Sequence, residues 1–76
     1  MATKKEKKEI IQLFERTLNN CSYYEKNNKT ISLANEIGVL RGIAYIMEVV
    51  NLCPHTDLFL HYIDVQQKLK DMEVNK

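Results

Sequence analysis

The apolar residues of the first third of the chain follow the spacing of a helix. Ile10, Phe14, Thr17, Cys21 and Tyr24 alternate steps of four and three residues, and only Thr17 among them is polar. The positions between them are mostly charged or amidic. One apolar side and one polar side at this period predict an amphipathic helix, which we place over residues 4–25.

The third part of the chain repeats this pattern. Leu58, Tyr62, Val65, Leu69 and Met72 again step by four and three residues. The spacing predicts a further helix over residues 56–72, with these side chains on its buried side.

The expected ends of these helices have local signals. Thr3 and Glu6 have the spacing of a capping box, so the first helix should begin near Lys4. Residues 25–29 contain no apolar side chain and include two asparagines, which predicts a loop. Pro54 cannot lie inside a helix without disrupting it and disfavours helical geometry at Cys53, so a second connection is expected there.

The middle segment has a different pattern, because the stretch 37–50 carries only two charges, Arg41 and Glu48. We expect one helix over residues 31–51 that is apolar nearly all round. A helix of this kind must be covered nearly all round. One half of its surface holds Ala34, Gly38, Val39, Gly42, Ile43, Tyr45, Ile46, Val49 and Val50. The other half combines Glu36, Arg41, Glu48 and Asn51 with Ile37, Leu40, Ala44 and Met47.

These patterns predict an all-α fold in a single domain over residues 1–76. The expected architecture is a three-helix antiparallel bundle, with the apolar second helix sandwiched between the other two. A chain of 76 residues builds only a small core. The second helix also has more apolar surface than two neighbours can cover, so we expect a homodimer or a higher helical oligomer.

Small residues recur within the second helix. Ala34, Gly38 and Gly42 lie four residues apart and would form a groove that another helix can approach closely. Glycine inside a helix costs roughly 1 kcal/mol relative to alanine, so two glycines suggest a packing role or a break in the helix.

The break would fit a known pattern. The segment 30–48 resembles the bacterial helix-turn-helix, with a Leu33-Ala34 pair followed by Gly38 at the turn and Arg41 where such proteins often contact DNA. The resemblance covers about a quarter of the chain and implies a small DNA-binding regulator built on Leu33–Met47. It departs from the pattern at Leu40, where a small hydroxyl residue usually starts the second helix of the motif. The alternative is a continuous helix in which the glycines are packing positions.

Composition narrows the function classes further. A net charge of +1 argues against a strongly basic coat for nucleic acid. Cys21 and Cys53 are isolated, so no disulfide framework is expected. The first five residues lack an apolar signal core, and the stretch 37–50 is too short to cross a bilayer. We therefore expect a cytoplasmic protein with reduced thiols and no membrane partner.

Two groups of residues raise the question of metal binding or catalysis. Cys21, Cys53, His55 and His61 lack the paired short spacing of zinc ligands, so no metal is expected. Asp57, His61 and Asp64 share one side of the third helix, but the sequence assigns them no nucleophile and no oxyanion donor. We therefore expect neither an enzyme nor a cofactor or small-molecule substrate.

The remaining interpretation is a non-enzymatic protein-interaction module, of the kind that small bacterial or phage adaptors and inhibitors represent. It would bind and modulate a partner protein through a helical surface. The expected contact residues are Leu40, Arg41, Tyr45, Met47 and Glu48. The alternative is the DNA-binding regulator described above.

Overall fold

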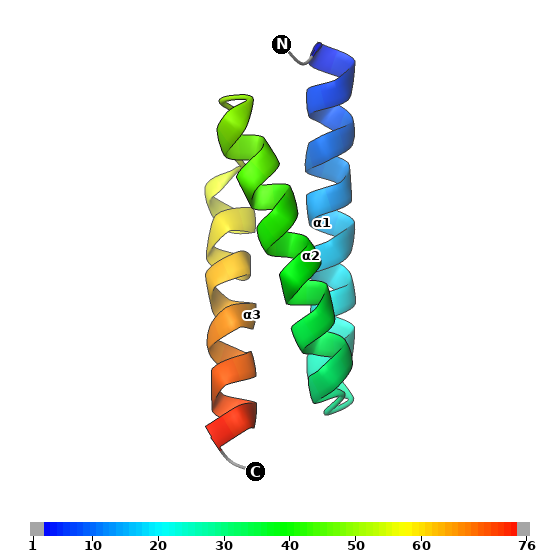
Figure 1. Ribbon diagram of the computed structural model, residues 1–76, viewed down its shortest axis with the longest axis vertical. Helices are drawn as coiled ribbons and strands as arrows, with labels where there is room; N and C mark the ends of the chain where they lie inside the picture. Colours follow the sequence, from blue (N-terminus) through cyan, green and yellow to red (C-terminus); the bar gives the residue numbers. More distant parts are fainter. Residues whose placement is uncertain (1–2, 75–76) are drawn as a thin grey trace.

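The computed structural model describes residues 3–74, and all regular secondary structure in this part of the chain is α-helical (Figure 1). The helices are α1 (Lys4–Lys26), α2 (Thr30–Val49) and α3 (Thr56–Val74), and their bounds lie within two residues of the predicted ones. The chain reverses direction at each connection. α2 crosses in the foreground from the lower end of α1 to the upper end of α3 (Figure 1). The all-α prediction is confirmed.

The start of α1 has the predicted capping box. The Thr3 hydroxyl accepts the backbone N–H of Glu6 at 3.1 Å, and the Glu6 carboxylate accepts the backbone N–H of Thr3 at 3.0 Å. These hydrogen bonds satisfy two donors that the first helical turn leaves without an intrahelical partner. The backbone bond from Thr3, followed by its side-chain bond, lowers the pKa of the Glu6 carboxyl.

Two asparagines end the first two helices. Asn28 and Asn51 adopt left-handed backbone conformations, with φ of 54° and 55°. At both ends, the residue after the asparagine donates its backbone N–H to the carbonyl five residues earlier, at 2.9 Å after α1 and 2.7 Å after α2. This is the Schellman arrangement, which asparagine accepts more readily than most residues other than glycine. It stops each helix sharply and lets the chain turn back.

All three helices contribute to one core. Thr17 is buried with this core, and its hydroxyl donates to the backbone carbonyl of Leu13 at 2.8 Å, so its polar group is satisfied. The Phe14 and Tyr62 rings meet edge to face at a centroid distance of 5.6 Å. The buried apolar side chains are Phe14, Leu18, Cys21, Leu33, Ile37, Leu40, Ile43, Met47, Val65 and Leu69.

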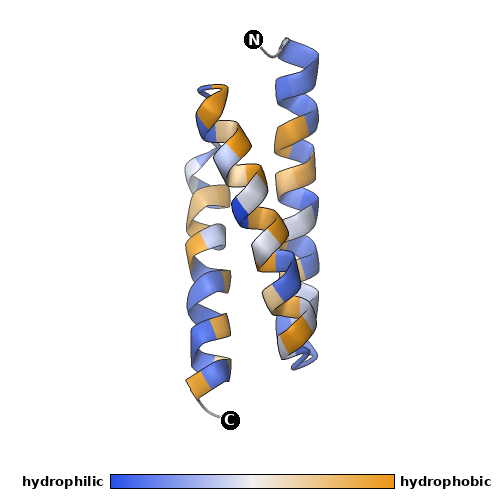
Figure 2. Cartoon of the chain, in the orientation of Figure 1, coloured by the Kyte–Doolittle hydropathy of each residue, from blue (hydrophilic) through white to orange (hydrophobic). Residues whose placement is uncertain are grey.

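α1 and α3 also touch each other, which corrects the expectation that α2 lies sandwiched between them. Besides the Phe14–Tyr62 contact, the Ser22 hydroxyl lies 2.7 Å from His61 Nε2, and the Lys68 ammonium lies 3.9 Å from the Glu25 carboxylate. α2 therefore rests on both helices with one side and leaves the other side uncovered. The α2 ribbon is coloured as hydrophobic over much of its length, with a few hydrophilic segments between (Figure 2).

Within residues 3–74, none of the three helices combines the length and apolar character that a bilayer crossing requires.

Candidate functional site on helix α2

The inward side of α2 is a row of large side chains. Leu33, Ile37, Leu40, Ile43 and Met47 are buried, and Leu33 and Leu40 have no exposed surface at all. This side packs against α1 and α3 and supplies half of the ten buried apolar residues of the core. The inward side therefore holds the fold together.

The opposite side of α2, which we call the outer face, is also apolar but is open to solvent. Its large side chains are half or more exposed, with values of 76% for Ile31, 65% for Val49 and 61% for Tyr45. No charged residue lies within it. The outer face consists of Ile31, Ala34, Asn35, Gly38, Val39, Gly42, Tyr45, Ile46 and Val49, all of them exposed.

The two glycines lie in the middle of the outer face. A methyl group on either Gly38 or Gly42 would meet no neighbouring heavy atom within 4 Å, and Ala34 is exposed as well. No segment of residues 3–74 therefore packs closely against these positions. The predicted close packing at Ala34, Gly38 and Gly42 stays a prediction. A helix that packs there would have to come from another molecule.

A pair of opposite charges borders the outer face on the side of α3. Arg41 and Glu48 are exposed and lie seven residues apart, which places them on the same edge of the helix. The Arg41 Nε donates to the Gln66 side-chain oxygen on α3 at 3.1 Å. The outer face is thus an apolar strip with one charged edge.

The structure divides the five predicted contact residues. Arg41, Tyr45 and Glu48 are exposed, and they lie on the outer face or at its edge. Leu40 and Met47 are buried in the core, so they are removed from the contact surface. A signal for their burial is present, because Leu33, Ile37, Leu40, Ala44 and Met47 step by four and three residues, as the buried sides of the other helices do.

Several exposed residues of the same surface were not among the predicted contacts. These are Ile31, Val39, Ile46 and Val49. In the sequence, these four residues alternate with the residues of the buried side. Helical spacing places them on the same side of α2 as Tyr45, but it does not show whether that side is buried or exposed.

α2 is one unbroken helix through Gly38. The helix runs from Thr30 to Val49, and no glycine has a positive φ in residues 3–74. The turn that a helix-turn-helix requires is therefore absent, and the expectation of a turn glycine at Gly38 is corrected. In addition, Leu33, Ile37 and Leu40 of this segment all lie on one side of α2 and are buried in the core of the protein.

Sequence reasoning also missed a side-chain pair between α1 and α3. Ser22 Oγ lies 2.7 Å from His61 Nε2, within half-buried surroundings, while Asp64 forms an ion pair with Lys68 at 3.3 Å. A serine beside a histidine is one part of a nucleophilic site. Both residues lie in helix interiors, where backbone N–H groups are used by the helix, so their own backbones offer no oxyanion-stabilising donors. The pair acts as a polar link between the two helices.

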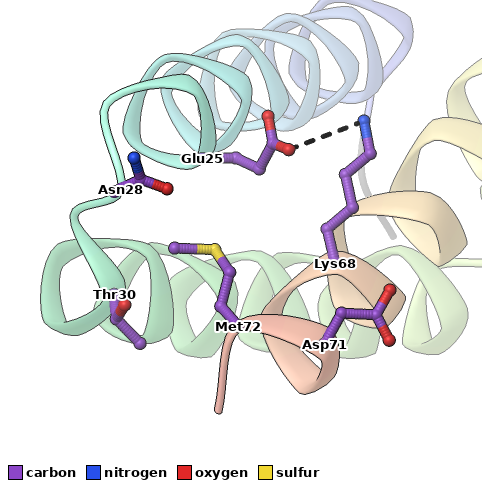
Figure 3. A pocket seen from close by; sticks show the side chains of 6 residues that line it. All are labelled: Glu25, Asn28, Thr30, Lys68, Asp71 and Met72. Carbon is purple, nitrogen blue, oxygen red and sulfur yellow. Dashed lines mark ion pairs between the residues drawn. The ribbon is translucent and has the colours of Figure 1, made fainter. Parts of the chain in front are cut away.

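Two of the grooves on the described part of the chain differ in character. An open polar groove of about 390 Å³ lies where α1, α2 and α3 meet at the lower end of the molecule, and there Lys68 reaches toward Glu25 (Figure 3). The Lys68 ammonium is paired with the carboxylates of Glu25, at 3.9 Å, and Asp64, at 3.3 Å. A smaller apolar groove of about 290 Å³ is lined by Phe14, Ala44, Met47, Glu48, Leu52, Cys53, Pro54, Phe59 and Tyr62.

The cysteines lie in contrasting surroundings. Cys21 is buried, and its burial, with a smaller effect of the Glu36 charge, raises the pKa of the thiol to about 11. Cys53 is exposed in the connection between α2 and α3. Across residues 3–74, no three His, Cys, Asp or Glu side chains come together in a way that could hold a metal ion.

Comparison with protein-family models, curated proteins and solved structures found no match to this chain.

Proposed function

We propose that this three-helix antiparallel bundle is a non-enzymatic protein-interaction module whose contact surface is the outer face of α2. The observation that carries the proposal is the exposure of five large apolar side chains along one uncharged strip, with two open glycines between them. Contiguous apolar surface of this kind on a small protein typically marks an interaction site.

The apolar surface is large enough to matter energetically. The exposed parts of Ile31, Val39, Tyr45, Ile46 and Val49 together equal about three whole side chains. Burying one such side chain contributes roughly 1.5–3 kcal/mol, so covering the strip contributes on the order of 5–9 kcal/mol per copy. Two such strips, one on each partner, contribute roughly 10–18 kcal/mol, which is of the same size as the cost of association, about 4–15 kcal/mol.

The chemistry of the strip favours a helix as the occupant. An amphipathic helix can lay its apolar side along the strip, while the open glycines allow its backbone to approach. Arg41 and Glu48 supply a charged edge, and Asn35 is a polar residue within the strip. A protein bound in this way is occluded or stabilised by the module, as expected for an adaptor or inhibitor. A second copy of the chain has the required helix, so a homodimer or higher helical oligomer is part of the proposal.

The α3 surface is a weaker candidate. Phe59, Leu60 and Ile63 are about half exposed there. Gln67 and Lys70 follow Ile63 at one and two turns along the same side, so polar groups interrupt this surface. The alternative of a DNA-binding regulator lost its structural basis with the continuity of α2 at Gly38.

Two tyrosines provide a matched test. Tyr45 on the outer face is 61% exposed and Tyr23 on α1 is 58% exposed, so their replacement by serine removes similar surface from different sides. Molar mass in solution at micromolar concentration and capture of a partner from host lysate are measured for both variants. We expect Tyr45→Ser to weaken association while Tyr23→Ser leaves it unchanged, with both variants folded by circular dichroism.

Equal association of the two variants and the wild type would remove the outer face from the interaction. A wild-type chain that stays monomeric and captures nothing would contradict the proposed function as a whole.

A further inference from the structure

We infer that the occupant of the outer face is a second copy of this chain, with the two α2 helices packed antiparallel about a midpoint between residues 43 and 44. This inference rests on the proposed function and adds the identity, direction and register of the partner. Three features of the outer face carry it: its small and large residues, its charged edge and its apolar edge.

The middle row of the outer face is complementary to itself. Gly38, Gly42, Tyr45 and Val49 follow steps of four, three and four residues. If two copies run antiparallel with the midpoint between residues 43 and 44, Gly38 lies opposite Val49 of the partner copy and Gly42 lies opposite its Tyr45. Each large side chain then meets a glycine, whose missing side chain leaves room for it.

The charged edge selects the same direction. In an antiparallel two-fold pair, each edge of the outer face meets its own counterpart, because the symmetry axis lies in the contact plane between the two helices and is perpendicular to both. Arg41 then lies within two residues of the level of Glu48 in the other copy, and the reverse pair forms by symmetry. Two opposite-charge pairs thus border the contact.

The apolar edge agrees with this arrangement. Val39 and Ile46 lie on the side of the outer face opposite to Arg41 and Glu48. In the antiparallel pair, Val39 meets Ile46 of the other copy, and apolar surface covers apolar surface. In a parallel pair the edges exchange, so Arg41 and Glu48 would face Val39 and Ile46, which desolvates charges without pairing them.

The arrangement also fits the shape of the molecule. α2 lies in the foreground of the fold, in front of α1 where the two helices overlap (Figure 1). The outer face points away from the core that α1 and α3 form with the inward side of α2. Two copies can therefore meet through α2 while the helices behind it stay in place.

Charge reversal tests the direction and register. Sedimentation equilibrium is measured for the wild type, Arg41→Glu, Glu48→Arg and the double variant R41E/E48R. Each single change turns two attractive pairs into two repulsive ones, so we expect the dimer dissociation constant to rise about ten-fold. The double change restores both pairs with exchanged signs, so it should return the dissociation constant to near the wild-type value.

A matched control uses a second pair with the same spacing. Glu9 and Arg16 are exposed on α1, carry opposite charges and also lie seven residues apart. Glu9→Arg and Arg16→Glu should leave the dissociation constant unchanged. Urea unfolding of all variants at low concentration verifies that the folded monomer is retained.

Disulfide trapping tests the register independently, in a Cys53→Ala background that removes the exposed native thiol. Tyr45→Cys places thiols of the two copies about 4.5 Å apart along the helix direction, so this variant should form a dimer on oxidation. Val49→Cys places them about 16 Å apart, so it should not. In a parallel pair, both variants would be trapped.

The outcomes separate the inference from the proposed function. A wild-type chain that is monomeric at all concentrations overturns the second copy as occupant, whereas the tyrosine comparison still decides whether the outer face binds another protein. A dimer weakened by Tyr45→Ser but not rescued in R41E/E48R, or one trapped at both cysteines, overturns the antiparallel register alone.

Discussion

The inward and outer sides of α2 are both apolar, yet only the inward side is buried. The inward row consists of large side chains such as Leu33, Ile37 and Leu40, which fill the space against α1 and α3. The outer row is interrupted by Gly38 and Gly42. A row of large side chains that leaves no gaps is favoured in a core, because each void loses van der Waals contacts. Side-chain volume, more than hydrophobicity, therefore decides which side of α2 forms the core.

Two isoleucines of the same helix test this comparison with the largest expected effect. Ile37 is 1% exposed on the inward side, and Ile46 is 50% exposed on the outer face. Ile37→Ala should lower the free energy of unfolding by about 2–5 kcal/mol, because it leaves a cavity in the core. Ile46→Ala should change it by less than about 1 kcal/mol.

Urea denaturation followed by circular dichroism measures both variants at low concentration, where association contributes little. Ile37→Val, with an expected loss of about 0.5–1.5 kcal/mol, keeps the comparison measurable if Ile37→Ala does not fold. Equal losses at Ile37 and Ile46 would contradict the assignment of the two sides.

Alkaline pH tests the core behind the inward side. Burial raises the pKa of the Cys21 thiol from 9.0 to about 11, so between these values the unfolded chain loses the proton first. The folded state then binds more protons, and the free energy of unfolding falls as the pH rises from about 9 to about 11. The loss from this group is at most about 2–3 kcal/mol.

The contribution of the Cys21 thiol is isolated by comparing variants. The Cys21→Ala variant should show a shallower fall in stability over this range than the wild type, measured by urea unfolding at several pH values. Cys53→Ala is the control, because Cys53 is exposed and lies outside the core. A Cys21→Ala profile as steep as that of the wild type would exclude the buried thiol as a cause.

Replacement of Gly38 or Gly42 by alanine has the smallest expected effect on stability, and it should act in opposite directions on folding and on association. Because a methyl group at Gly38 or Gly42 meets no neighbour within 4 Å, alanine at either position should raise the free energy of unfolding by about 1 kcal/mol. The same methyl group would occupy the gap between two packed α2 helices and weaken the dimer. The paired readout is urea unfolding at low concentration and sedimentation equilibrium at high concentration. Loss of monomer stability would indicate a neighbour at the glycine.

Local sequence signals predicted most of the fold. The capping box at Thr3 and Glu6, the polar loop around Asn28 and the break at Pro54 each depend on residues close in sequence. The steps of four and three residues likewise identify the helices and the buried sides of α1 and α3, because each of these helices has one dominant apolar side.

The candidate site was only partly predictable, for a physical reason. α2 carries two rows with the same helical spacing, one through Leu40 and Met47 and one through Gly42 and Tyr45. Periodicity cannot rank two such rows, so it does not by itself show that the row of Leu40 and Met47 is the buried one. The contact between Ser22 and His61 could not be predicted either, since it joins residues 39 positions apart in the sequence.

Three helical passes along a molecule 43 Å long leave the Lys4 end of α1 and the Val74 end of α3 at opposite poles (Figure 1). In the proposed antiparallel pair, the Lys4 pole of each copy lies beside the Val74 pole of the other. A fluorescence donor at one pole and an acceptor at the other, carried by separate molecules, would then exchange energy only in the assembled state. Because the number of helices is odd, the two ends of the chain lie at opposite poles, and energy transfer between labels at these ends measures assembly.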